Sequence, residues 1–132
     1  MKCRKFSDIS EKTRKQRNRM LAEELRKNKR KARGQMRLNG GRCCLQVAED
    51  LAIKCGLDID RSDADSGEPG IQVQRFYGWK DRNPSLISEE NKRCRASVLN
   101  DGNEVIITSL KKLPKKGYPH KKIAEFFEKT YG

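Results

Sequence analysis

The sequence predicts a small α+β protein: a mostly helical single domain with one β-hairpin, preceded by a basic N-terminal helical arm. Three observations favour this fold class. Apolar residues recur at helical spacing in residues 43–55 and 120–131, two apolar runs flank a turn in residues 95–110, and basic residues gather before residue 43. At 132 residues, the chain is long enough for one modest domain and a tail.

The positive charge is concentrated near the N-terminus. Residues 1–42 carry 16 of the 31 Lys and Arg residues but only 4 of the 18 acidic residues, and the whole chain has a formal net charge of +13. A surface that only had to be soluble would mix both signs. Segregated positive charge instead indicates a polyanionic partner.

A helix is expected over residues 8–31, because this stretch has no Gly or Pro and is rich in helix-forming side chains. Ser7 is its expected N-cap. Apolar residues are sparse, so only the Met20–Leu25 segment is expected to dock on a core, and the part before it to be solvated. We therefore divide the chain into a basic arm, residues 1–33, helical and partly disordered when free, and a compact α+β domain, residues 34–132.

The first core helix is expected from Cys43 to Cys55, with Gly56 at its end. Asn39-Gly40-Gly41 before it indicates a turn. Residues 71–79 fit either a strand or a short helix ended by Gly78, and we favour the helix, with its aromatic side chains in the core.

The hairpin is expected within Arg95–Leu110, around the turn Asn100-Asp101-Gly102-Asn103. Residues 84–93 before it are expected to be a loop or a short helical turn. The last helix is expected from His120 to Tyr131, with an apolar face that ends the core.

Residues 56–70 are rich in Asp and indicate an exposed acidic loop. An EF-hand interpretation fails because Asp63 or Glu68 falls where that loop needs Gly. No pair of cysteines has zinc-ligand spacing, and one histidine cannot complete the usual set. We therefore expect no metal and no cofactor.

Catalysis has little support, and no catalytic residue is assigned. A Cys/His pair would need His120, the only histidine, which is expected at the surface. Cys43 or Cys44 at a helix N-terminus would have a lowered pKa, but Cys44 also lies on the apolar helix face, so packing explains it better. A cysteine-dependent enzyme is kept as an alternative function.

The basic arm is the candidate functional site, because Lys and Arg on nearly every side of a helix match a phosphate backbone and gain from counterion release. No recognition motif accompanies it, so binding is expected to ignore base sequence. The expected nucleic-acid-binding residues are Lys12, Arg14, Lys15, Arg17, Arg19, Arg26, Lys27, Lys29, Arg30, Lys31 and Arg33. The alternatives are a solvated basic tail and an arm or domain that docks on an acidic host protein.

Three parts of the chain resemble a group of small uncharacterised proteins of tailed bacteriophages and prophages. Residues 25–45, including Arg42-Cys43-Cys44-Leu45, are similar to that group's "LR…G.L…RCCLG" start. Phe76-Tyr77-Gly78-Trp79 is similar to its "WLGL" segment. Leu99-Asn100-Asp101, Gly117 and residues 123–127 are similar to its "LND…G.SF.EIA..I" ending.

The chain departs from that group at Gln46, where Gly is usual, at His120, where Phe is usual, and by an insertion over residues 103–115. The resemblance implies a phage origin and a compact helical domain, not a mechanism. Together with the basic arm, it leads us to expect a non-enzymatic viral accessory protein that binds DNA or RNA. The alternative is a host-takeover inhibitor of a polymerase or defence nuclease. No signal peptide or membrane span is recognisable, so we expect it in the cytoplasm, that of the host cell if phage-encoded.

Overall fold

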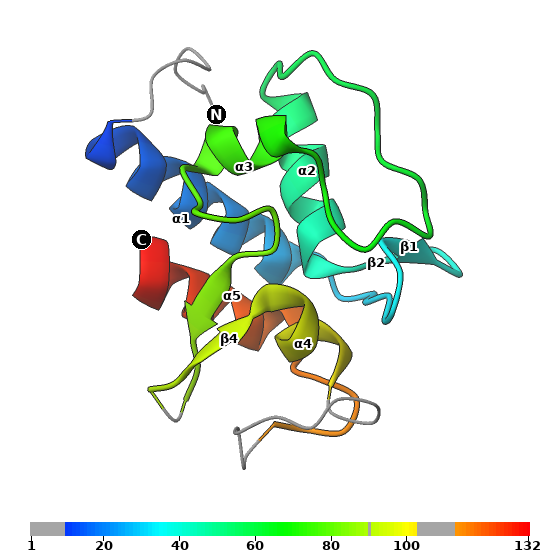
Figure 1. Cartoon of the computed structure of the whole chain (residues 1–132). Helices are drawn as coiled ribbons and strands as arrows, with labels where there is room; N and C mark the ends of the chain where they lie inside the picture. The colour runs from blue at the N-terminus through cyan, green and yellow to red at the C-terminus, as the bar shows by residue number, and fades with distance from the viewer. Residues whose placement is uncertain (1–9, 90, 103–112) are drawn as a thin grey trace.

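The computed structural model describes residues 10–89, 91–102 and 113–132. Within these ranges the chain forms five helices and two small antiparallel hairpins (Figure 1). The α+β class and the mostly helical character are therefore confirmed. None of the described helices is long and apolar enough to cross a membrane.

The elements follow the chain in a simple order. The helices are α1 (Glu11–Lys27), α2 (Cys44–Lys54), α3 (Ile71–Tyr77), α4 (Ala96–Asp101) and α5 (His120–Tyr131). The strands are β1 (Arg37–Leu38), β2 (Gly41–Arg42), β3 (Ser85–Ile87) and β4 (Arg93–Arg95). Strand β1 pairs with β2, and β3 pairs with β4.

Helices α2, α3 and α5 lie where the sequence predicts them. Helix α2 buries the apolar face of its 3.6-residue period, and Gly56, with φ of 107°, follows its end. Helix α3 ends at Gly78, which is left-handed, and Trp79 beyond it is buried. Helix α5 packs along α1, so the two ends of the described chain form one layer (Figure 1).

Helix α1 is shorter than expected and more deeply packed. It begins at Glu11, because the Ser10 hydroxyl accepts a hydrogen bond from the Thr13 amide, and it ends at Lys27 rather than residue 31. The expectation of a solvated basic helix before Met20 is wrong, since Thr13, Arg17 and Asn18 are all buried. Helix α1 is thus part of the core rather than an arm beside it. The expected start at residues 7 and 8 lies outside the described residues.

Two polar side chains of α1 hold the end of α3. Arg17 Nη1 donates to the Phe76 carbonyl at 2.8 Å, and its guanidinium lies 4.3 Å from the centre of the Phe76 ring. Asn18 donates to the Tyr77 carbonyl at 3.0 Å and accepts from the Trp79 indole at 2.9 Å. These bonds satisfy carbonyls that a helix leaves unpaired in its last turn, which is why a charged residue is buried here.

The predicted hairpin is misplaced. Residues 96–101 form α4, not a strand, because Ala96 and Leu99 pack on the core as one helical face and Gly102 ends the helix at a φ of 94°. Residues 103–110 of that prediction lie outside the described residues. The hairpins instead lie at residues 37–42, where Asn39 and Gly40 both have positive φ, and at residues 85–95, where a loop or helical turn was expected.

Because α1 belongs to the core, replacing its buried Leu21 should destabilise the whole protein. We expect Leu21→Ala to lower the free energy of unfolding by about 2–5 kcal/mol, through the reduced burial and the cavity left behind. The exposed Glu23→Ala on the same helix should change it by less than about 0.5 kcal/mol. Urea denaturation followed by circular dichroism measures both. Equal, small effects would mean that α1 is not part of the cooperative core.

Candidate functional site

The buried amide of Asn100 joins three segments that are distant in the sequence. Its oxygen accepts from the Cys44 amide at 3.0 Å and so caps the N-terminus of α2. Its nitrogen donates to the Ala32 carbonyl at 2.7 Å and to the Asp101 carboxylate at 2.8 Å. The Cys-Cys-Leu and Leu-Asn-Asp motifs of the sequence therefore meet in space, and Asn100 has a capping role there.

The two cysteines of the first motif are packing residues. Cys43 is the N-cap of α2, with its sulfur 3.4 Å from the Gln46 amide and 3.5 Å from the Met36 sulfur. Burial raises the pKa of Cys43 to about 11 and raises the pKa of Cys44 well above the ordinary thiol value. Both thiols are therefore protonated at neutral pH, which is the opposite of an activated nucleophile.

His120 is not at the surface, contrary to expectation. Its side chain is buried at the start of α5, and Nδ1 lies 2.8 Å from the Asn28 carbonyl just after α1. Burial lowers its pKa, and the bond to Asn28 opposes that shift. The imidazole thus connects α5 to the chain that leaves α1.

Helix α1 presents fewer available cations than its sequence suggests. Arg17 is buried and bonded to α3, so its assignment to the nucleic-acid-binding set is wrong. Arg14 Nη2 and Lys15 Nζ lie 3.9 and 3.3 Å from the Glu11 carboxylate oxygen Oε1. Arg26 pairs with Glu128, and Arg19 donates to the carbonyl of Gly132. Burial or an ion pair thus engages Arg14, Lys15, Arg17 and Arg26, whereas Arg19 is exposed.

The other expected cations lie mostly after the middle of α1. Lys12 is exposed on the first turn of α1, whereas Lys27, Lys29 and Arg30 are exposed at its C-terminal end and just beyond. Lys31 and Arg33 are partly buried in the next segment, residues 28–36. The basic surface is therefore displaced from the helix to the chain that follows it.

That segment lies against residues 113–118, which the sequence places far away. Lys31 Nζ donates to the carbonyls of Lys116 and Tyr118 at 2.9 and 2.8 Å. Arg33 donates to the carbonyls of Asp101 and Lys115 at 2.9 and 3.3 Å. Carbonyl acceptors carry no net charge, so these bonds orient the two cationic side chains without adding a negative charge.

Two glycines permit this approach. A Cβ atom on Gly102 would collide with the carbonyl of Lys115, and one on Gly117 would collide with the backbone of Asn100. Both residues also have positive φ, which favours glycine. Residues 115–117 can therefore pack directly on the end of α4, and the exposed Lys115 and Lys116 are brought beside Arg33.

We call the resulting group the basic surface: Arg30, Lys31, Arg33, Lys115 and Lys116. A hollow of about 480 Å³ lies within it, and its lining residues are Arg30, Lys31, Ala32, Arg33, Leu38, Asn39 and Gly41. None of these lining residues, all in the described part of the chain, is acidic. Burial lowers the pKa of Lys31 to about 8, and the neighbouring Arg33 acts in the same direction. Lys31 is thus mostly charged at pH 7, and an anion beside it would favour its charged form.

Lys115 and Lys116 were not in the predicted set. The sequence places them in a short Lys- and Gly-containing loop, which has no helical or strand periodicity. The sequence feature that could have identified them is a pair of lysines close to Gly102 and Gly117, because glycine permits two backbone segments to approach closely. This feature does not show which other segment packs against the lysines.

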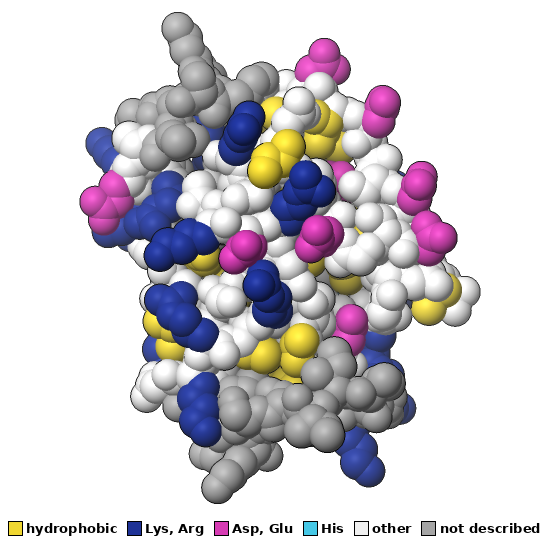
Figure 2. Space-filling view, in the orientation of Figure 1, with side chains coloured by type: hydrophobic (Ala, Val, Ile, Leu, Met, Phe, Trp, Pro, Cys, Tyr) yellow, Lys and Arg dark blue, Asp and Glu magenta, His cyan; other side chains and the backbone are white. Residues whose placement is uncertain are grey.

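Acidic side chains gather elsewhere on the molecule. The loop between α2 and α3 exposes Asp58, Asp60, Asp63, Asp65 and Glu68, as predicted, and acidic side chains project along the right-hand side of Figure 2. Arg61 holds the loop to Asp50 at 2.8 Å. Within the described ranges, no group of three or more His, Cys, Asp or Glu side chains could hold a metal ion.

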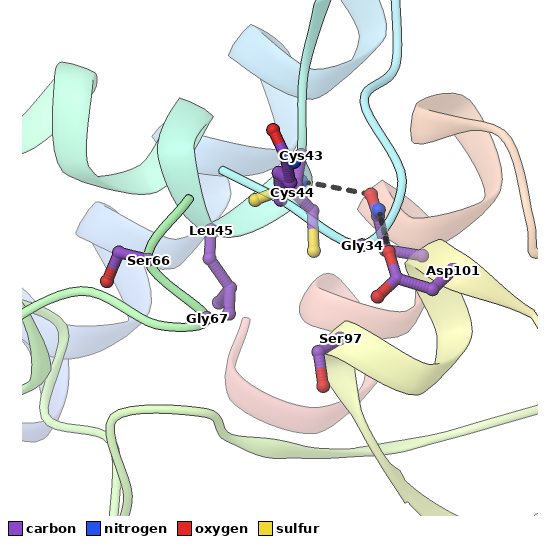
Figure 3. A pocket seen from close by; sticks show the side chains of 10 residues that line it. Gly34, Cys43, Cys44, Leu45, Ser66, Gly67, Ser97 and Asp101 are labelled. Carbon is purple, nitrogen blue, oxygen red and sulfur yellow. Dashed lines mark hydrogen bonds between the residues drawn. The ribbon is translucent and has the colours of Figure 1, made fainter. Parts of the chain in front are cut away.

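A second, more enclosed pocket of about 180 Å³ adjoins the basic surface (Figure 3). Its walls come from the start of α2, from α4, and from the loops at Gly34 and Gly67. The lining residues are Gly34, Gln35, Cys43, Cys44, Leu45, Ser66, Gly67, Ser97, Asn100 and Asp101. Both motifs joined by Asn100 therefore contribute to one pocket.

Comparison with known proteins adds no family to this geometry: no protein-family model, curated protein or solved structure matches the chain.

Removing the Asn100 amide should destabilise the protein without touching the basic side chains. We expect Asn100→Ala to lower the free energy of unfolding by about 2–4 kcal/mol, because the buried Cys44 amide and Ala32 carbonyl lose their partner. Chemical denaturation measures the change. Gln72→Ala, which removes an exposed amide, is the control and should have almost no effect. If Asn100→Ala lowers the free energy of unfolding as little as the control does, the capping role of Asn100 is contradicted.

Thiol reactivity should follow burial. Burial raises the pKa of all three thiols, but Cys43 and Cys44 are buried, whereas Cys94 is half-buried. We therefore expect iodoacetamide at pH 7.5 to label Cys94 before Cys43 or Cys44. Peptide mass spectrometry over time measures the order, and urea should abolish it. Labelling of Cys43 or Cys44 ahead of Cys94 in the native protein would instead support a thiol-dependent activity.

Proposed function

We propose that this protein is a non-enzymatic, phage-type accessory protein that binds the backbone of a nucleic acid through the basic surface. The observation that carries the proposal is the meeting of residues 30–33 with residues 115–116, fixed by the bonds of Lys31 and Arg33 to backbone carbonyls. Five cationic side chains from two distant segments share this surface. A phosphate backbone is the polyanion that such an array suits best.

The carbonyl bonds support binding in two ways. They orient Lys31 and Arg33 through acceptors that carry no net charge, so little side-chain entropy remains to be lost when a phosphate arrives. Arg30, Lys115 and Lys116 are exposed, and Arg30 lines a hollow that has no acidic lining residue. Phosphate contacts of this kind fix position and carry no base sequence.

The basic surface does not coincide with the basic arm that the sequence predicts, because it lies after α1 rather than along it. Lys27 and Lys29 remain beside it as exposed cations, whereas Arg14, Lys15 and Arg26 are paired with carboxylates. Exposed ion pairs are weak, so those residues still add to the long-range field that attracts a polyanion. The protonated, buried thiols of Cys43 and Cys44 favour a binding protein over a cysteine-dependent enzyme.

The triple variant Arg30→Ala, Lys115→Ala and Lys116→Ala tests this surface, because all three side chains are exposed and none forms a described ion pair. We expect its affinity for a 24-base-pair DNA duplex to fall by about tenfold or more at 0.1 M salt. The slope of log affinity against log salt should become shallower by about 0.9 for each phosphate that the variant no longer neutralises. Fluorescence anisotropy titrations at four salt concentrations measure both quantities.

A charge-matched control removes Lys54, Lys80 and Arg82, which are exposed on other parts of the molecule. This control should keep most of the affinity and the salt slope. If the two triple variants weaken binding equally, net charge rather than the assigned surface accounts for binding. If the unmodified protein binds with no dependence on salt, or does not bind, the proposed function is wrong.

A further inference from the structure

We propose that the pocket beside the basic surface accepts one unstacked nucleobase of a single-stranded nucleic acid, whose hydrogen-bond donors face the carboxylate of Asp101. This inference rests on the proposed function, because the basic surface would hold the phosphates of the same strand. It adds a binding site for a base and a preference for single-stranded nucleic acid, and neither follows from backbone binding alone.

The pocket and the basic hollow are consecutive along one segment. Residues 30–33 line the hollow, and Gly34 and Gln35, the next two residues, line the pocket. Arg33 also donates to the carbonyl of Asp101, which lines the pocket from α4. A strand whose phosphates lie on the basic surface therefore has the pocket within reach of a neighbouring base.

The walls of the pocket suit a flat heterocycle. Leu45 runs toward Gly67 on one side, and Asp101 lies across from them, with Ser97 below (Figure 3). The side chain of Leu45 offers apolar contact for one face of a ring, and the Asp101 carboxylate lies across from it, whereas Ser66 lies beyond Leu45 and Gly67 (Figure 3). Its volume of about 180 Å³ is of the order of one base.

Asp101 is the group that would read the base. One of its oxygens accepts from Asn100 at 2.8 Å, and this bond fixes the carboxylate. Within the described residues its other oxygen has no hydrogen-bond partner, so it can accept from a ligand. A carboxylate accepts from the N–H groups of a base edge, and guanine presents the most donors there, at N1 and N2. A phosphate would be repelled, so the pocket and the basic surface take different parts of one ligand.

Gly67 is a position at which the pocket can be tested by substitution. A Cβ atom at this position would meet open space, and its φ is not in the left-handed region, so neither packing nor backbone strain requires glycine. Since Gly67 lines the pocket, we expect a branched side chain at this position to narrow it. Gly70, in the same loop, also faces open space but does not line the pocket, and it provides a matched control.

The test uses fluorescein-labelled 12-nucleotide dT strands that differ only at one central position: guanine, adenine, cytosine, thymine or an abasic site. All five carry the same phosphate charge, so differences report the base alone. We expect the guanine strand to bind about fivefold or more tighter than the abasic strand at 0.1 M salt.

Two variants then assign the preference to the pocket. Asp101→Asn should remove the preference for guanine, and Gly67→Val should remove all discrimination between base and abasic site. Gly67→Val should keep the affinity for the abasic strand and its salt slope, which depend on phosphates. Asp101→Asn removes a negative charge near Lys31, so it should not lower the affinity for the abasic strand. Gly70→Val should behave like the unmodified protein, and thermal denaturation checks that each variant folds.

The outcomes separate the two proposals. If the abasic strand binds as tightly as the others, no base enters the pocket and this inference is overturned, while backbone binding stands. If discrimination persists in Gly67→Val, the base is read elsewhere, and the inference is again overturned. If no strand binds at any salt concentration, the proposed function itself has failed.

Discussion

The hydrogen bonds of one buried amide organise the side of the molecule that carries the basic surface. Asn100 accepts from the first amide of α2 and donates to the carbonyl of Ala32 and to Asp101. An unpaired amide or carbonyl is costly when buried, so these bonds fix α2, α4 and the segment after α1 relative to one another. The basic surface and the pocket both lie along the segments that this amide joins.

Lys31 and Arg33, at the centre of the basic surface, both donate to backbone carbonyls. Lys31 reaches Lys116 and Tyr118, and Arg33 reaches Asp101 and Lys115. A carboxylate orients a cation and cancels much of its charge, whereas a carbonyl orients a cation without adding a negative charge. On α1, Glu11 and Glu128 face several of the cations.

The burial of a few polar residues on α1 shows why composition alone wrongly predicted a solvated basic helix. Arg17 and Asn18 look like surface residues in a basic helix, yet they bond the last carbonyls of α3 and the Trp79 indole. Nothing local in residues 11–20 indicates that partner, because it lies about sixty residues away. The same limit applies to residues 96–101, whose Asn-Asp-Gly sequence is typical of a turn but whose packing makes them a helix.

The sequence by itself determined the α+β class, helices α2, α3 and α5, the exposed acidic loop and the excess of positive charge toward the N-terminus. Each of these depends on local periodicity, propensity or charge, which a linear chain displays directly. Only the tertiary structure decided which cations are available and which segments meet. Long-range contacts bury Arg17 and His120, bring Lys115 and Lys116 beside Arg33, and join Cys44 to Asn100. Such contacts depend on packing between distant segments, and no local pattern specifies them.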